Sequence, residues 1–343
     1  MAAHLWDGVS PLGGIARLHP ILAAHMLLDG GGLSMHRGHP HRGWGRAFRF
    51  VLRVLPAILV IAALAGWVSQ TGGGAPPSAR ASGSMQVLWR ADAERPLSRQ
   101  WAEYSTAAHC AVLTGTVRRD RRAFRERFRA AQGSYAYEFR LRNGDRCFGE
   151  RAEVGQALPS RSGFTRPRLF REGDDRWIAF QVYLSRHFHV RSRNWDVIAQ
   201  WKQGLSTAVV PVPMVALQVH DGGFYLERAD GTTSTEARTI GTRLARAYRR
   251  RWVRMVVHIN FSTDPAAGFV EVYGDPNGTG MRLLMPLEHF STLATDAAGA
   301  PVPAHARIGI YRSPAIRGKA RLFYDGYTVA TSRTAAQRVA FAP

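Results

Sequence analysis

Three short stretches of the sequence place side chains that could do chemistry two to four residues apart. They are Arg151 and Glu153 in ERAEV, Gln200 and Lys202 in VIAQWKQ, and Arg307 and Tyr311 in ARIGIYR. Arginine and lysine neutralise carboxylates, and tyrosine can transfer a proton when it lies beside a reacting bond. This combination suits an acidic chain molecule, whose charges the cations would hold.

All three stretches alternate apolar and polar residues, which is typical of half-buried β-strands. Gln200 and Lys202 share one face of their strand, while Val197, Ala199 and Trp201 are predicted on the opposite face. If the three strands are neighbours in one sheet, their polar faces form a trough lined by arginine, glutamate, glutamine, lysine and tyrosine. A concave sheet with this lining would bind an acidic sugar chain.

The chain repeats this period-two pattern from about residue 121 onward, with Gly, Pro and Asp at the breaks. RWIAFQVYL and RWVRMVVHINF predict two long strands whose apolar residues face a core. Gln181, Tyr183 and Arg254 occupy the polar faces of these strands, and we expect them to add to the substrate-binding surface. Many short strands without a long helical stripe predict an all-β sandwich or jelly roll.

The composition is that of a globular protein with a large excess of positive charge. The 343 residues are 45% hydrophobic and carry 46 Lys and Arg against 25 Asp and Glu, a formal net charge of +21. A field of this sign attracts polyanions such as nucleic acids, anionic lipid headgroups and acidic polysaccharides. A solvated basic surface without a partner is the alternative, so charge by itself does not identify the ligand.

The first 85 residues divide into three parts of different composition. Residues 1–47 are rich in Gly, His and Arg, and residues 48–68 contain an apolar run with arginines on its N-terminal side. That run is shorter than the ~20 residues of a usual membrane-spanning helix. It is therefore predicted to be a signal peptide, with a retained membrane anchor as the alternative. Residues 69–85 form a Gly/Pro/Ser linker, and the folded domain is predicted over 86–333, outside the cell.

Two cysteines, Cys110 and Cys147, fall in the domain predicted to be exported. An even number of cysteines in an oxidising compartment favours one disulfide, with two separate buried thiols as the alternative. Neither cysteine has a Cys or His neighbour at the spacing of zinc sites, so no metal site is predicted there.

ERAEV, QWK and RIGIYR, in this order, resemble three signature strands of jelly-roll polysaccharide lyases of the alginate lyase, glucuronan lyase and heparin lyase I type. The typical patterns of these lyases are RxE, QxH and a YxKxGxY-like stretch. VLWRADAERPLSRQW and ARLFYDGYTVA also resemble the two ends of the heparin lyase I-like domain, so the resemblance covers roughly residues 86–333. It implies a concanavalin-like jelly-roll β-sandwich with a concave substrate-binding sheet.

The resemblance also implies cleavage of a uronic-acid-containing polysaccharide by β-elimination. This reaction needs a neutralised uronate carboxylate, a base for the C5 proton and an acid for the leaving O4. Carried over to this sequence, Arg151 and Gln200 hold the carboxylate or the sugar near it, and Tyr311 is the acid and in some members also the base. Arg307 stands where the family often has lysine. Glu153 either orients Arg151 or forms a purely structural ion pair.

Lys202 departs from the family pattern, which has histidine at this position. A lysine can act as a base only if burial or neighbouring cations lower its pKa by several units, and Arg151 and Arg307 are such cations. The chain is then either an enzyme, in which Lys202 is the base or Tyr311 makes both proton transfers, or a catalytically inactive carbohydrate-binding protein. His187, His189 and His258 are candidates to replace the missing imidazole, but nothing in the sequence places them in the trough.

Other classes of enzyme lack their motifs in this chain. It contains no paired acidic motif of a glycoside hydrolase, no GxSxG elbow, no P-loop and no HExxH. It also contains no recognisable nucleic-acid module. We therefore expect the protein to bind an anionic polysaccharide and not nucleic acid. We also expect it to be a monomer that contacts the membrane only through its N-terminal segment. No cofactor is predicted. Structural Ca²⁺ is compatible with such sandwiches, but no Asp-rich loop argues for it.

Overall fold

The computed structural model describes residues 85–104, 116–120, 129–145, 149–156, 159–160, 163–164, 169–203, 212–230 and 238–343. The predicted leader, apolar segment and linker up to residue 84 lie outside these residues, as do Cys110 and Cys147. The signal peptide and the disulfide therefore stay predictions. Among the described residues, no helix is long and apolar enough to cross a membrane.

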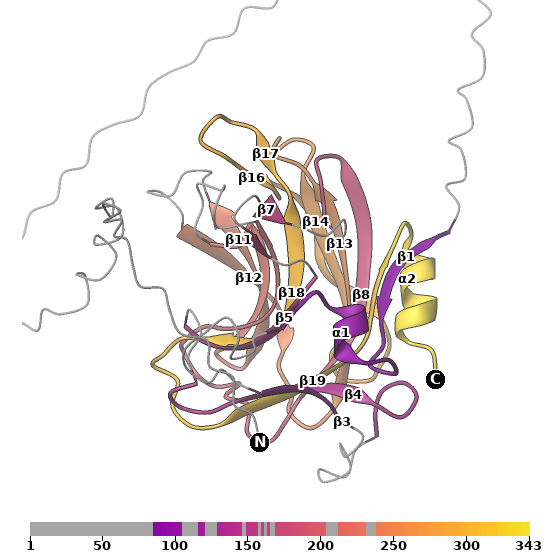
Figure 1. Cartoon of the computed structure of the whole chain (residues 1–343), viewed down its shortest axis with the longest axis vertical. Coiled ribbons are helices and arrows are strands. Elements are labelled where there is room, and N and C mark those ends of the chain that lie inside the picture. The colour runs from indigo at the N-terminus through magenta and orange to yellow at the C-terminus, as the bar shows by residue number, and fades with distance from the viewer. Residues whose placement is uncertain are drawn as a thin grey trace, which may run out of the picture. The chain divides into compact units, whose positions relative to one another are not determined.

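Two antiparallel sheets form the domain, and Figure 1 shows them as facing layers. The strands of the first sheet are β1 (Val87–Ala91), β3 (Thr116–Asp120), β4 (Ala136–Leu141), β8 (Asp174–Leu184), β13 (Trp252–Phe261), β14 (Phe269–Asp275), β15 (Arg282–His289) and β19 (Ala320–Ala330). Their order is β15-β14-β13-β8-β19-β4-β3, and β1 also pairs with β19.

The second sheet carries all three stretches with which the sequence analysis began. Its strands are β2 (Glu103–Tyr104), β5 (Glu150–Gly155), β9 (Asp196–Gln203), β10 (Val215–His220), β11 (Gly223–Asp230), β12 (Arg238–Arg246) and β18 (Ala304–Arg312). Their order is β12-β11-β10-β9-β18-β5-β2. The remaining elements are β6 (Pro159–Ser160), β7 (Gly163–Phe164), β16 (Ala294–Thr295), β17 (Pro301–Val302), α1 (Leu97–Gln100) and α2 (Arg333–Ala340).

The hydrophobic core lies between the two sheets, as the alternating pattern of the long strands predicted. The inward residues of β8 and β13 are completely buried in it, for example Phe180, Val182, Met255 and Ile259. Each such side chain contributes about 1.5–3 kcal/mol through burial of apolar surface. The predicted all-β jelly-roll sandwich is confirmed.

A C-terminal helix, α2, covers part of the outer face of the first sheet, and the sequence analysis did not predict it. Ser332 caps the helix, because its side chain accepts a hydrogen bond from the backbone N–H of Ala335. Ala335, Ala336 and Ala340 pack against Ala179 of β8. Small side chains on both surfaces let the helix lie close to the sheet, so the part of the face beneath the helix is covered.

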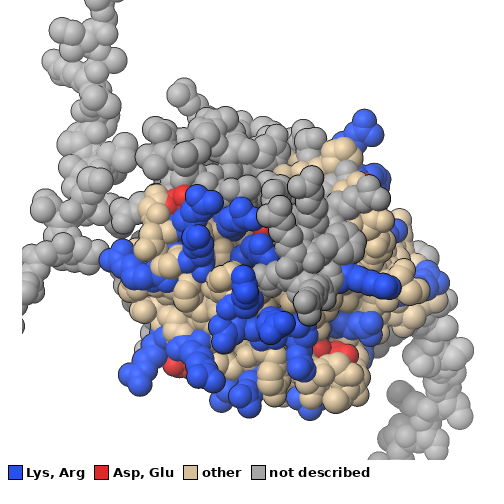
Figure 2. Space-filling view, turned by 90° about the horizontal axis from the view of Figure 1, so that it is seen from below, with Lys and Arg blue, Asp and Glu red and all other residues tan. Residues whose placement is uncertain are grey.

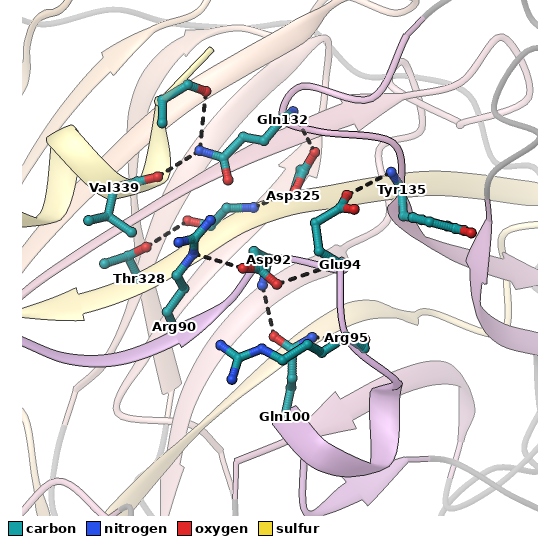
Figure 3. A network of polar contacts seen from close by, with 12 residues as sticks. Arg90, Asp92, Glu94, Arg95, Gln100, Gln132, Tyr135, Asp325, Thr328 and Val339 are labelled. Carbon is teal, nitrogen blue, oxygen red and sulfur yellow. Dashed lines mark hydrogen bonds and ion pairs between the residues drawn. The ribbon is translucent and has the colours of Figure 1, made fainter.

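A network of polar contacts ties the start of the domain and helix α2 to strand β19 (Figure 3). The backbone N–H of Gln132 donates to Asp325 (2.8 Å), and its side-chain amide donates to the carbonyl of Val339 (2.6 Å). Glu94 accepts a hydrogen bond from the backbone N–H of Tyr135 (2.9 Å). Burial raises the pKa of Asp325 to about 8, although backbone donors oppose this shift.

Candidate functional site

Six of the predicted site residues lie on three adjacent strands, β5, β18 and β9, of the second sheet. Tyr311 on β18 is paired with Arg151 on β5, and Arg307 on β18 is paired with Gln200 on β9. Lys202 follows Gln200 on the same strand face. The predicted trough therefore forms because the three strands are hydrogen-bonded neighbours.

Glu153 is the buried centre of this group, with 3% of its surface exposed. It accepts a hydrogen bond from the side-chain amide of Gln200 (2.6 Å). One oxygen of its carboxylate also lies 3.6 Å from the guanidinium of Arg151 and 4.0 Å from that of Arg307. The hydrogen bond fixes the amide, and the charge of the carboxylate attracts both guanidinium groups at distances longer than a hydrogen bond. Glu153 therefore connects residues of all three strands.

Gln200 uses its amide N–H on Glu153, which leaves its carbonyl oxygen for other partners. That oxygen is buried and has no hydrogen-bond partner among the described residues. A buried polar atom without a partner costs about 1–3 kcal/mol.

Tyr311 is held from three sides. The guanidinium of Arg151 lies over its ring, 4.1 Å from the centroid, and the ring of Trp195 meets it edge to face at 4.9 Å. Gly149 has a φ of +103°. A Cβ at this glycine would lie 2.7 Å from a ring carbon of Tyr311. The position therefore requires glycine both for its backbone conformation and for the space that the phenol occupies.

The environment of Lys202 lowers its pKa to about 8, mainly through burial and further through the charges of Arg307 and Arg151. Glu153 opposes this shift. The amine is thus partly neutral near physiological pH, and a neutral amine can accept a proton.

A cleft of about 490 Å³ opens over this sheet. Gln200, Lys202 and Tyr311 line it, together with Trp195 and residues of β10 and β11. Arg151 and Arg307 lie beside them toward β5, each with about one seventh of its side chain exposed (14%). The cleft is thus lined by a phenol and by an amine of lowered pKa, and two guanidinium groups lie beside them.

Val197 lies on the opposite face from the one predicted. It lines the cleft with Gln200 and Lys202, whereas Ile198 and Ala199 both face the core. The pairing of β9 with β10 and with β18 shifts by one residue at this point. Such a bulge reverses the alternation of side chains, which a strict period of two does not anticipate.

Gln181, Tyr183 and Arg254 do not line the cleft, contrary to expectation. They lie on β8 and β13 of the first sheet, on the side of helix α2. The amide of Gln181 donates to the carbonyl of Ala340 (2.9 Å), and the guanidinium of Arg254 lies over the ring of Phe341. Alternation identified their polar face correctly, but not the sheet to which the face belongs.

The three histidines considered as substitutes also lie away from the cleft. His258, on the outer face of the first sheet, contacts Glu271 (2.7 Å) and Asp175 (2.6 Å). His187 and His189 belong to the loop between β8 and β9 and line a different hollow. Within the described ranges, no group of three or more His, Cys, Asp or Glu side chains could hold a metal ion.

The structure adds site residues that the sequence analysis missed. His305 on β18 is paired with Lys202, and its ring accepts a hydrogen bond from the Arg307 guanidinium (3.0 Å). Burial and the neighbouring cations lower the pKa of His305 well below its usual value. His220 and Glu227 line the cleft on the β10–β11 side, 3.4 Å apart. His305 shares the alternating face of Arg307, and His220 belongs to an alternating strand, so both were detectable.

The fold and the cleft define a β-sandwich protein with basic side chains in and beside a cleft over one sheet. Residues 98–328 match the polysaccharide lyase family, and the chain belongs to that family. Family membership supports a role in degrading or binding a polysaccharide. No curated protein matches the sequence.

Solved structures similar to this chain are distant in sequence. Alginate lyase A1-II′, a member of polysaccharide lyase family 7, is 13% identical, with a TM-score of 0.43 over 59% of this chain and 82% of that one. The cellulose-induced protein Cip1 is 12% identical, with a TM-score of 0.43 over 71% and 97%. The binding domain of botulinum neurotoxin DC is 8% identical, with a TM-score of 0.37 over 66% and 44%.

Proposed function

We propose that this protein is an extracellular lyase that cleaves a uronic-acid-containing polysaccharide by β-elimination. The observation that carries the proposal is the convergence of Tyr311 with an amine of lowered pKa and two guanidinium groups on three adjacent strands. Cations neutralise the substrate carboxylate, which makes the C5 proton acidic, and the other groups transfer protons.

The reaction assigns one task to each part of the cleft. Arg151 and Arg307 hold the uronate carboxylate. The neutral amine of Lys202 accepts the C5 proton, the C4–C5 double bond forms, and the bond from C4 to O4 breaks. Tyr311 donates its phenolic proton to O4, and the proton taken up by Lys202 later returns to the phenolate through water. The side-chain amide of Gln200 holds the Glu153 carboxylate, which orients Arg151 and Arg307.

One feature supports the assignment of the proton acceptor to Lys202. Its pKa of about 8 lies within reach of physiological pH, and a catalytic base works best when its pKa lies near the operating pH. The arrangement in which Tyr311 makes both transfers leaves Lys202 as a third cation for the carboxylate. A Lys202→Met variant distinguishes these two arrangements. It should lose nearly all turnover if Lys202 is the base, but not if Tyr311 makes both proton transfers.

The test is incubation of the purified protein with a panel of glucuronan, alginate and heparin-like chains. We expect ultraviolet absorbance from the 4,5-unsaturated product on at least one of them, and none from a neutral glucan. Product formation in Tyr311→Phe at the parent rate would contradict the assigned acid.

A catalytically inactive polysaccharide-binding protein is the second candidate. The observation that favours it is Lys202 itself, because the lyases that this chain resembles have histidine at the corresponding position. In that case the protein would bind a uronate chain, release no unsaturated product, and keep its affinity in Tyr311→Phe.

A further inference from the structure

A second group of cations lies at one end of the sandwich, outside the cleft. The loops 185–195, 247–251 and 313–319 meet there, because residues of all three line one hollow. Figure 2, the view from below Figure 1, shows a face on which Lys and Arg side chains gather and few Asp or Glu interrupt them. We call this surface the cationic end.

Two hollows make up the cationic end. The first, of about 620 Å³, is lined by five exposed cations: Arg186, Arg191, Arg249, Arg317 and Lys319. The second, of about 470 Å³, shares Arg191 and Arg249 with the first and adds the exposed Arg243 and Arg246. A ligand that covers both hollows would therefore meet a continuous cationic surface.

These cations lack the counter-charges that other arginines have. Arg90 is paired with Asp92 at 2.9 Å, and Arg176 is paired with Asp174. Within the described part of the chain, none of the cations in the two hollows pairs with a carboxylate, and Asp221 is the one acidic residue of their lining. Gathered charges of one sign repel one another and attract anions. The cationic end is thus suited to a ligand with several negative charges.

The linings of the cleft and of the cationic end follow one another along two segments of the chain. Arg191 and Ser192 line the first hollow, and the next residues, Arg193 to Trp195, line the cleft. On the neighbouring strand, His220 lines the cleft and Asp221 lines the second hollow. A chain that lies in the cleft and passes Trp195 therefore reaches the cationic end.

We propose that the cationic end is an extension of the substrate-binding cleft, which holds the carboxylates of uronate residues beyond the one that is cleaved. This inference rests on the proposed function. It implies that the preferred substrate is a long polyuronate chain. A short oligosaccharide that fills only the cleft would not contact the loops 247–251 and 313–319.

The test compares R317Q/K319Q with the unaltered protein on a polyuronate and on a tetrasaccharide of the same sugar. Each exposed charge contact contributes up to about 1 kcal/mol, so the double variant should raise the KM for the polymer about fivefold and at most about thirtyfold. The KM for the tetrasaccharide and kcat on either substrate should change by less than about twofold. Equal changes of KM on both substrates, or no change on either, would overturn the proposal.

R282Q/R338Q is the matched control, because it removes two exposed cations from β15 and α2, outside the cationic end. It should leave the KM for the polymer unchanged. A loss equal to that of R317Q/K319Q would show that net charge alone attracts the polymer, and the proposal would fail. In about 1 M salt, where the Debye length is ~3 Å, the difference between R317Q/K319Q and the unaltered protein should disappear.

Direct binding keeps this proposal separate from the proposed function. If the protein forms no unsaturated product, the catalytic proposal fails, and affinity electrophoresis in a polyuronate gel still compares the two double variants. Weaker retardation of R317Q/K319Q alone supports the extended surface. Competition by single-stranded DNA as strong as that by the polyuronate would identify a general polyanion surface and overturn the proposal.

Discussion

Two polar strand faces of this molecule are similar in sequence but differ in what surrounds them. Gln200 on β9 and Gln181 on β8 are both buried glutamines on the polar face of an alternating strand. Gln200 donates its amide to Glu153 and leaves its carbonyl without a partner beside the cleft, whereas Gln181 donates to the last turn of helix α2. A polar face becomes a site only where no other element covers it.

The surroundings of the two faces also differ in charge. Around Gln200, a single buried carboxylate orients two guanidinium groups and an amide, and an amine of lowered pKa lies beside them. Around Gln181, alanines of the helix pack against an alanine of the sheet. Cations held beside an open cleft are suited to binding and chemistry, while close packing of small residues is suited to stability.

The largest difference between the two faces is expected for their tyrosines. Tyr311→Phe removes the proposed acid, and general acid–base groups contribute about a hundredfold to ten-thousandfold in rate. We therefore expect kcat to fall by about that factor while polysaccharide affinity stays within about twofold. Initial rates of unsaturated product and equilibrium binding measure the two quantities.

Tyr183→Phe is the control from the outer face of the first sheet. Tyr183 is buried against Trp252 and Phe323, so the loss of its hydroxyl should leave kcat unchanged. If the two variants lose activity equally, the contrast between the faces is wrong.

A smaller loss is expected from the lysine of the cleft. Lys202→Ala removes a cation and the proposed base, so kcat should fall about a hundredfold and KM should rise several-fold. Lys202→His should retain substantial activity, because an imidazole of pKa ≈ 6.5 can serve as a base near neutrality. A kcat of Lys202→Ala within about twofold of the parent's would argue against a base at this position.

The sequence predicted the sandwich and most of the cleft because both depend on local patterns. Alternation places Arg307 and Tyr311 on one strand face. The three motifs lie on adjacent strands, although their order in the sheet, β9-β18-β5, differs from their order along the chain. The sequence did not predict which polar faces helix α2 covers, because that depends on long-range packing. The bulge that turns Val197 into the cleft also escaped a fixed period of two.

The pH dependence of binding and turnover offers a finer test of the lysine. The pKa of Lys202, about 8 in the folded protein, lies below the 10.5 of an exposed lysine. The charged form attracts the substrate below about pH 8 and this attraction is lost above it, so KM should rise with pH. The neutral form accepts the proton, so kcat should rise with pH, with a midpoint above 8 because a bound uronate favours the ammonium.

Lys202→Arg separates these two effects. Arginine stays protonated across this range, so polymer affinity should no longer fall above about pH 8, and kcat should be low at every pH. A rise of KM with pH in the variant equal to that of the parent would assign the pH dependence to another group.

The smallest effect is expected on the covered face, and it should appear in stability rather than in activity. Gln181→Ala removes one buried hydrogen bond to helix α2, which is worth about 0.5–1.5 kcal/mol, and leaves the carbonyl of Ala340 without that donor. A domain of this size should lose about 2–4 °C in Tm per kcal/mol, which thermal unfolding followed by circular dichroism can resolve. KM and kcat should not change, because Gln181 lies in the other sheet from Tyr311 and Lys202. Gln200→Ala is the counterpart, because it removes the amide that Glu153 holds and should raise KM. A Gln181→Ala protein with the parent's Tm but a raised KM would place this glutamine at the substrate, and the distinction between an open and a covered face would then fail.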